Sequence, residues 1–207
     1  MNFLAHLYLS GESEKVKVGN FIGDYIKGKK YMNYHPDVQK GIILHRNIDH
    51  FTDKHPLVIQ SSQKLKDGFG RYSGVVVDLI YDHFLANYWS EYHSSSIEQF
   101  VTKSHEILVK NYLILPNKVK MFLPFLIQSR RLESYAHLDG LQTALDIMAR
   151  RTSLPDQSEY AIDTLQEHYK DFEEEFKSFM KDMLIYVTNE HHINVATPNG
   201  WHPNEGR

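Results

Sequence analysis

Apolar residues recur three and four positions apart along almost the whole of this 207-residue chain, and this spacing restricts the fold more than any other feature. On an α-helix such positions share one face, which a globular protein buries against neighbouring elements. The clearest stripe is Ile162, Leu165, Tyr169, Phe172, Phe176, Phe179, Met183 and Tyr186. We expect the acids between them, including residues 173–175, to lie on the solvated face. Because VVVDLI at 75–80 is the only strand-like run, the sequence predicts an all-α protein.

Prolines, glycines and capping residues divide this pattern into helices. Pro36 suits the first turn of a helix that ends at His55-Pro56, and Ser96 with Gln99 forms a capping box. The predicted helices cover residues 2–9, 15–26, 36–54, 57–66, 75–92, 97–109, part of 116–124, 132–151, and a long segment from about 156. No internal repeat or Gly/Ser linker interrupts them. We therefore expect a single helical domain over residues 1–190 and a polar C-terminal tail over 191–207.

The chain contains 13 histidines and no cysteine. The lack of cysteine excludes thiol catalysis, cysteine zinc sites and disulfides, and it favours a reducing compartment. Any metal would be held through nitrogen and oxygen. The apolar stretch at the N-terminus is too short for a signal peptide or a membrane span. We therefore expect a cytoplasmic protein without a membrane contact.

Charge is divided unevenly along the chain. Residues 1–155 hold 19 Lys and Arg against 15 Asp and Glu, whereas residues 156–190 hold 10 acids and 3 lysines. The basic excess is too small for a nucleic-acid-binding face, which argues against a nucleic acid partner.

The segment LHRNIDHFTD at 44–53 gathers more ionisable side chains than any other. Because helical residues four apart are offset by roughly 40°, His45, Asp49 and Asp53 fall on one face. Arg46 lies beside them, where a guanidinium could bind a phosphate bidentately. The alternative is an ordinary surface pair of His45 and Asp49, worth a few tenths of a kcal/mol.

A second group lies in VVVDLIYDHFL, where Asp78 and Asp82 are one turn apart and His83 follows. Their neighbours are apolar, and a buried carboxylate without a partner costs several kcal/mol. A divalent metal would satisfy both carboxylates. Asp24, at the end of an apolar turn, and His6, in an apolar helix, are further candidates, although for His6 alone a core or capping histidine is the better interpretation.

Basic pairs remain open to two interpretations. Lys27, Lys29 and Lys30, and the pairs Arg130-Arg131 and Arg150-Arg151, could bind an acidic partner. The arginine pairs could equally be helix C-terminal residues that complement the helix dipole.

The order of these motifs resembles the bacterial acyl carrier protein phosphodiesterases. The resemblance rests on MNFLAHLYLS, GNFIGDYIKG, GIILHRNIDHFTDKHP, DLIYDHFLANYW and RLESYAHLDGLQTALDIMARR, which lie in collinear order over about residues 1–190. It implies an all-helical fold similar to HD-domain metal phosphohydrolases, with the site elements rearranged, because the adjacent pair here is Asp82-His83 and not His-Asp.

The resemblance also implies a reaction. It is the Mn²⁺-dependent hydrolysis of the phosphodiester that joins 4′-phosphopantetheine to holo-acyl carrier protein, an acidic partner; Mg²⁺ or Fe²⁺ are alternative metals. The matching polar positions are Asp24, His45, Arg46, Asp49, Asp53, Asp78, Asp82 and His83.

Among these positions we expect distinct roles. Asp49 or Asp53 would orient or deprotonate the attacking water, and Arg46 would stabilise charge on the phosphate. The metal ligands would be Asp24, His45, Asp78, Asp82 and His83. The alternatives are an HD-like phosphohydrolase of small nucleotides or other phosphodiesters, and a non-catalytic helical module that binds an acidic partner.

Overall fold

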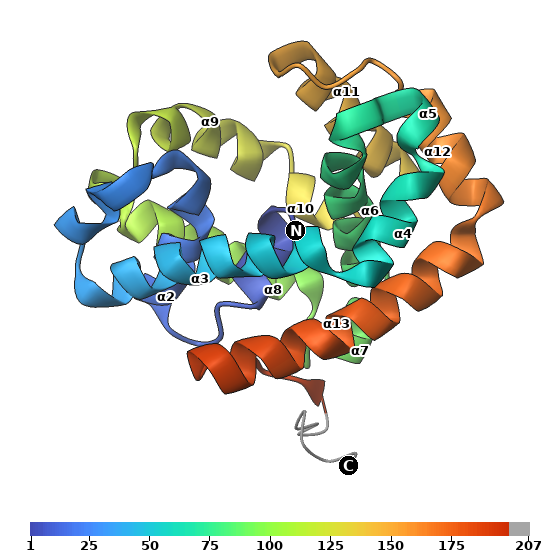
Figure 1. Cartoon of the computed structure of the whole chain (residues 1–207). Helices are drawn as coiled ribbons and strands as arrows, with labels where there is room; N and C mark the ends of the chain where they lie inside the picture. Colours follow the sequence, from blue (N-terminus) through green and yellow to red (C-terminus); the bar gives the residue numbers. More distant parts are fainter. Residues whose placement is uncertain (199–207) are drawn as a thin grey trace.

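The computed structural model describes residues 1–198, and these form thirteen α-helices and four short 3₁₀ turns with no strand (Figure 1). The first seven helices are α1 Phe3–Tyr8, α2 Glu14–Ile22, α3 Pro36–Lys54, α4 Pro56–Lys64, α5 Lys66–Phe69, α6 Ser73–Asn87 and α7 Trp89–Tyr92. The others are α8 Ile97–Lys110, α9 Asn117–Gln128, α10 Arg131–Ser134, α11 Leu138–Arg151, α12 Ser158–Glu167 and α13 Tyr169–His191. The 3₁₀ turns are η1 Gly23–Tyr25, η2 Gly28–Asn33, η3 Gly70–Tyr72 and η4 Tyr112–Ile114. The all-α prediction is confirmed.

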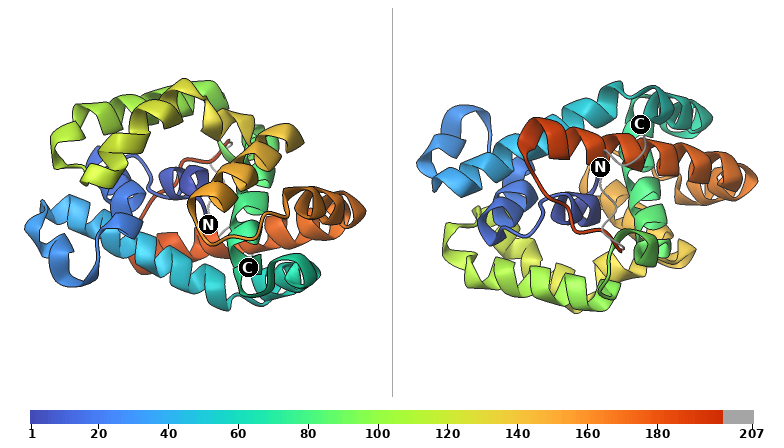
Figure 2. Two further views of the ribbon diagram at one scale, coloured as in Figure 1. Left: turned by 90° about the horizontal axis from the view of Figure 1, so that it is seen from above. Right: turned by 90° about the horizontal axis from the view of Figure 1, so that it is seen from below.

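The short helix α1 lies in the middle of the molecule, with α3, α6, α8 and α9 around it (Figure 2). Its residues Leu4 to Tyr8 are all buried, so the one histidine among them, His6, is enclosed on every side. A buried polar side chain needs a partner. The partners of His6 therefore define the centre of the fold.

Helices α2 and α3 cross at a pair of glycines, which allows their backbones to touch. A Cβ atom on Gly19 would lie 2.1 Å from the carbonyl oxygen of Val38, and one on Gly41 would lie 2.2 Å from that of Val16. No larger side chain fits at either position. This close crossing brings the middle of α3, which carries His45 and Asp49, against the end of α2 and the η1 turn.

The longest helix, α13, runs beside α3 and α4 and covers the core with a stripe that includes Phe172, Phe176 and Phe179 (Figure 1). The predicted aromatic stripe is thus confirmed as core. One of the acids expected on its solvated face is not solvated, because Glu175 is buried and accepts hydrogen bonds from Ser61 and Lys64 at 2.5 Å each.

Several helix boundaries differ from the sequence prediction. The expected helix over 132–151 is two helices, α10 and α11, and the long C-terminal one is also two, α12 and α13. The second break follows from packing, because α12 lies against α11 while α13 lies against α3, α4 and α6. One straight helix could not reach both surfaces. The helix over 36–54 and the capping box at Ser96 are confirmed.

The segment after α13 is packed in its first part. Ile193 and Val195 are buried, and the Ile193 side chain approaches Gly11. The predicted polar tail over 191–207 therefore begins with a docked stretch, and its residues 199–207 lie outside the described part of the chain. No helix within residues 1–198 is both long and apolar enough to cross a membrane.

Candidate metal centre

Two buried histidines and one carboxylate from α1 and α3 meet at the centre of the molecule. The rings of His6 and His45 stack with their centroids 4.1 Å apart. Asp49 contacts both rings, since its Oδ1 lies 3.1 Å from His6 Nε2 and its Oδ2 lies 3.2 Å from His45 Nε2. Among residues 1–198, these three are the one group of three or more His, Asp or Glu residues with ligand atoms all within 4.8 Å of one another.

The hydrogen bonds around His6 fix which ring nitrogen carries the proton. The amide nitrogen of Asn20 donates to the His6 carbonyl at 2.8 Å and to Ser10 Oγ at 2.9 Å, so Asn20 Oδ1 must accept. That oxygen lies 2.8 Å from His6 Nδ1, which is therefore the protonated nitrogen. Nε2 then faces two further acceptors, the Met1 carbonyl and Asp49 Oδ1, each at 3.1 Å.

A lone pair that faces two oxygen acceptors is unfavourable unless a cation lies among them. Protonation of Nε2 would remove the conflict, but burial, followed by the nearby His45, lowers the pKa of His6 to about 4. His6 is therefore neutral at pH 7, with its Nε2 lone pair directed at Asp49. This is the tautomer in which histidine binds metals through Nε2.

His45 lies between two carboxylates. Its Nε2 is 3.3 Å from Asp24 Oδ1 and 3.2 Å from Asp49 Oδ2, yet neither ring nitrogen has a hydrogen bond of acceptable geometry to any described residue. Burial by itself lowers the pKa of His45, but the two carboxylates outweigh it and raise the pKa to about 9. His45 correspondingly lowers the pKa of Asp24. The side chain is 6% exposed and Asp24 is 66% exposed, so this pair connects the cluster to solvent.

A glycine in the η1 turn makes room for His45. A Cβ atom on Gly23 would lie 2.3 Å from Cγ of the His45 ring. The backbone of Gly23 is ordinary right-handed helix, at φ −51° and ψ −44°, so the requirement concerns space and not conformation. The same turn carries Asp24, which explains how GNFIGD supplies both a contact surface and a carboxylate.

The donor set fits a divalent transition metal. Ligand atoms about 2.1 Å from one ion lie roughly 3 to 3.5 Å apart, which matches the separations around His45 Nε2 and His6 Nε2. Imidazole with carboxylate suits Mn²⁺, Fe²⁺ or Zn²⁺, and the carboxylates add affinity for Mg²⁺. The orphaned Nε2 of His45, which faces both carboxylates, is an atom that such an ion would satisfy.

The predicted ligands on α6 have other partners. Asp82 is fully buried and accepts hydrogen bonds from the backbone amides of Leu4 at 2.9 Å and Ala5 at 3.2 Å, so it caps the first turn of α1. Asp78 Oδ1 lies 2.7 Å from the α-amino group of Met1. Burial raises the pKa of both carboxyls, to about 7 for Asp82. Both residues hold α1 in place, and through it they position His6.

His83 and Asp53 also lie outside the cluster. His83 Nδ1 donates to the Tyr135 carbonyl at 2.8 Å, and its Nε2 lies 3.5 Å from the Tyr169 hydroxyl. Asp53 is exposed and lines a shallow groove with Lys66 and Arg71. The i, i+4 spacing therefore places Asp49 against His45, whereas Asp53, one turn further along α3, lies outside the cluster.

Arg46 holds the loop that follows the η1 turn. Its guanidinium donates to the carbonyls of Ile26 at 2.7 Å and Gly28 at 2.9 Å, and it stacks on the Tyr31 ring at 5.2 Å. These contacts fix the segment that follows Asp24. The phosphate-binding role of Arg46 stays a prediction, and the contacts of Arg46 in the structure indicate that it positions this loop.

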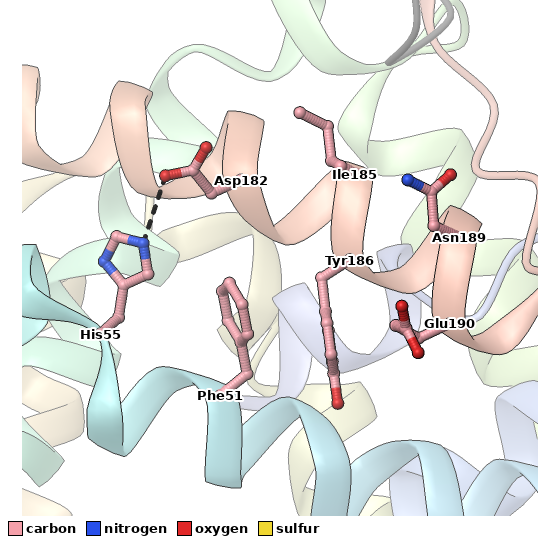
Figure 3. A pocket seen from close by; sticks show the side chains of 7 residues that line it. All are labelled: Phe51, His55, Asp182, Ile185, Tyr186, Asn189 and Glu190. Carbon is pink, nitrogen blue, oxygen red and sulfur yellow. Dashed lines mark hydrogen bonds and ion pairs between the residues drawn. The ribbon is translucent and has the colours of Figure 1, made fainter.

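A separate groove of about 390 Å³ lies between α3 and α13. Its lining is Phe51, His55, Asp182, Ile185, Tyr186, Asn189 and Glu190 (Figure 3). Phe51 and Tyr186 stack at 4.4 Å, and His55 pairs with Asp182 at 3.3 Å. None of the three clustered residues lines it, so we place the candidate site at the buried cluster, where the ligand atoms converge.

Asn20 is not among the site residues predicted from the sequence, and His6 is predicted there only as a further candidate. Both residues sit within apolar runs, where a single polar side chain suggests a satisfied core residue. Only the contact of Asn20 with His6, 14 residues away, reveals that the two act together. The lone polar residue on each run is a weak signal that could have drawn attention to them.

Comparison with known proteins agrees with the motif order. The sequence model described as acyl carrier protein phosphodiesterase matches residues 1–183. Proteins named acyl carrier protein phosphodiesterase are 31% identical in Photorhabdus laumondii, over 92% of this chain and 96% of that protein, and 30% identical in Enterobacter sp. strain 638, over 92% and 99%. A protein of the same name in Yersinia pestis is 28% identical, over 89% of this chain and 96% of that protein.

No solved structure matches the chain, so the predicted likeness to HD-domain phosphohydrolases stays a prediction. The family match covers all the residues of the candidate centre, together with the helices α1, α3 and α6 that position them. The chain belongs to the acyl carrier protein phosphodiesterase family.

Proposed function

We propose that the protein hydrolyses the phosphodiester between 4′-phosphopantetheine and the serine of holo-acyl carrier protein. The products are apo-carrier and free phosphopantetheine. We propose further that His6, His45 and Asp49, with Asp24 beside them, hold one divalent cation, for which Mn²⁺ is the first choice and Fe²⁺ or Mg²⁺ are alternatives. The proposal includes the cytoplasmic location expected from the cysteine-free sequence.

The observation that carries this proposal is the pair of stacked, buried histidines whose ring nitrogens lack suitable partners. His6 Nε2 faces only acceptors, and both nitrogens of His45 are orphaned. A non-catalytic binding module would have no use for such a buried cluster, which costs stability unless a cation completes it. Membership of the family supports carrier hydrolysis over the hydrolysis of nucleotides.

A cation bound there would lower the pKa of a coordinated water and polarise the phosphoryl group. Asp49 bridges the two histidines and holds both rings in position, while Asn20 keeps the proton of His6 on Nδ1. Asp24 lies on the exposed side, and its lowered pKa keeps it ionised at neutral pH. In this proposal Asp24, expected from the sequence to be a metal ligand, takes the proton from the attacking water. That role was expected from the sequence for Asp49 or Asp53, but Asp49 faces both histidines.

The bond changes are simple. The water oxygen forms a bond to phosphorus, the bond between phosphorus and the serine oxygen breaks, and that oxygen takes up a proton. Positive charge close to Asp24 favours a substrate that carries a negatively charged phosphodiester. Three exposed lysines lie on the segment that follows Asp24, namely Lys27, Lys29 and Lys30.

The test is the conversion of holo-carrier to apo-carrier, measured as a shift on a conformation-sensitive gel. We expect conversion with Mn²⁺, none in EDTA, and recovery when Mn²⁺ is restored. His45→Ala should lower the rate more than about 100-fold. His50→Ala is the matched control, because His50 lies on the same helix, is exposed, and should leave the rate unchanged.

Two results would contradict the proposal. Conversion that continues in EDTA would exclude the metal, and full activity of His45→Ala would exclude the site. A panel of nucleotides and small phosphodiesters assayed in parallel separates the alternative, since their hydrolysis without any carrier conversion would support a different substrate.

A further inference from the structure

The outer surface of η4 and α9 exposes an unusual amount of apolar area. Six of the ten exposed large apolar side chains in the described part of the chain fall within residues 109–125. Leu113 is 88% exposed and Met121 is 82% exposed, against 43% for Phe125. A concentration of exposed apolar side chains of this kind marks interaction sites on soluble proteins. We call the surface formed by residues 112–125 the α9 face.

Positive charge surrounds the α9 face. Residues 107–132 contain three lysines and two arginines and no acid. Lys120 lies over the Tyr112 ring at 5.4 Å, and both Arg131 and Arg151 lie over the Phe125 ring, at 5.2 Å and 5.5 Å. The arginines come from α10 and α11, so three helices converge on Phe125.

Some of these cations have acidic neighbours, since Lys110 pairs with Glu14 and Arg130 with Glu133. Lys118 is exposed at the start of α9, beside Met121 on the same face. Aromatic residues, methionine and arginine are the types enriched in protein interfaces. The composition therefore indicates a partner that is acidic and has an apolar patch of its own.

The inner side of α9 connects the α9 face to the candidate centre. The Phe122 ring packs against Tyr25 at 5.7 Å and against Phe3 at 5.8 Å. Tyr25 directly follows Asp24, the most exposed carboxylate of the centre. A protein that docks on the α9 face would thus stand beside the solvent side of the site.

We infer that the α9 face is where the acidic acyl carrier protein docks, with Met121 and Phe125 as apolar anchors and Lys118 among the attracting charges. This inference rests on the proposed function. It assigns the recognition of the carrier to a surface distinct from the residues proposed to hold the metal.

The experiment measures binding of apo-carrier, the product, by isothermal titration calorimetry, and steady-state hydrolysis of holo-carrier. Met121→Glu and Lys118→Glu should each weaken binding at least tenfold and raise KM with little change in kcat. Wild-type binding should weaken as ionic strength rises. Thermal unfolding should be unchanged, because both side chains are exposed.

Matched controls carry the same substitutions elsewhere. Ile59→Glu on α4, where the side chain is 47% exposed, controls for Met121→Glu, and Lys54→Glu at the end of α3 controls for Lys118→Glu. Both controls should bind the carrier as the wild type does.

Each contrary result has its own meaning. If the wild type binds the carrier and both α9-face variants bind it equally well, the docking surface is refuted while the proposed function stands. If Met121→Glu instead abolishes a dimer of this chain and leaves carrier binding unchanged, the face serves self-association and the inference is likewise overturned. If the wild type neither binds nor hydrolyses the carrier, the proposed function itself fails, and the docking surface with it.

Discussion

Replacement of Gly23 by alanine should damage the metal centre without unfolding the protein. The added methyl group would lie 2.3 Å from Cγ of the His45 ring, whereas carbon atoms in contact are ordinarily about 3.5 Å apart. The ring, or the η1 turn, must therefore move by about 1 Å. The backbone angles of Gly23 suit alanine, so no conformational strain contributes.

The expected cost has two parts. Overpacking of this kind destabilises by about 1 to 3 kcal/mol. A displacement of about 1 Å at a catalytic group can cost roughly a hundredfold in rate. We therefore expect Gly23→Ala to fold, with a modestly lowered midpoint of urea unfolding in EDTA, while Mn²⁺ affinity and carrier hydrolysis fall by about 10- to 100-fold.

The matched control is Gly74→Ala in α6, where the nearest atom to the new methyl group is Ser62 Oγ at 4.0 Å. That variant should keep its affinity for Mn²⁺ and gain a little stability, since alanine is favoured over glycine in a helix. If Gly23→Ala binds Mn²⁺ as tightly as the control does, the position assigned to His45 in the metal centre is refuted.

Three further predictions concern the charge of His45 and the residues that position α1 and the loop after Asp24. In EDTA, the free energy of unfolding should fall by roughly 3 kcal/mol between pH 6.5 and 9, and it should change less in His45→Gln. The reason is that the pKa of His45 is raised to about 9 in the folded protein, so its stabilising contribution is complete below the unfolded pKa of 6.5 and is lost as pH rises through 9. A wild-type curve parallel to that of the variant would refute the pairing of His45 with Asp24 and Asp49. Asp82→Ala should lower the free energy of unfolding by about 2 to 4 kcal/mol, since it leaves two buried amides of α1 unpaired. Asp82→Asn keeps one side-chain oxygen and can accept from only one of these amides, so it should lose part of that stability and keep the Mn²⁺ affinity; a complete loss of Mn²⁺ binding in a folded Asp82→Asn would instead make this residue a ligand. Arg46→Gln should speed tryptic cleavage within residues 27–30 several-fold, because the loop loses two charge-assisted hydrogen bonds. An unchanged cleavage rate would contradict the conclusion that Arg46 holds this loop in place.

Features that depend on nearby residues could be predicted from the sequence. The helical class follows from the apolar spacing, and α3 has its predicted bounds because Pro36 and His55-Pro56 determine both ends locally. The pairing of His45 with Asp49 is also local, since it depends only on a separation of one helical turn. The breaks at residues 135–137 and at His168 depend on which surfaces the flanking helices contact, and no local signal encodes them.

The candidate site required contacts between distant segments. The burial of Asp82 was expected, and the inference that a buried carboxylate needs a partner was sound. The partner turned out to be the backbone of α1, 77 and 78 residues away, which a sequence pattern cannot distinguish from a metal. The role of His6 depends on Asn20 and on Asp49, which lies 43 residues from it in the chain. These partners of His6 can be identified only in the folded structure, where the three residues lie together.

The central claim is that His6, His45 and Asp49 bind a divalent cation. Its most direct test is a crystal of the protein grown with Mn²⁺ and measured for anomalous scattering. We predict one strong anomalous peak within about 2.3 Å of His6 Nε2, His45 Nε2 and an oxygen of Asp49. A peak among Asp78, Asp82 and His83, or no peak at the buried cluster, would contradict the account.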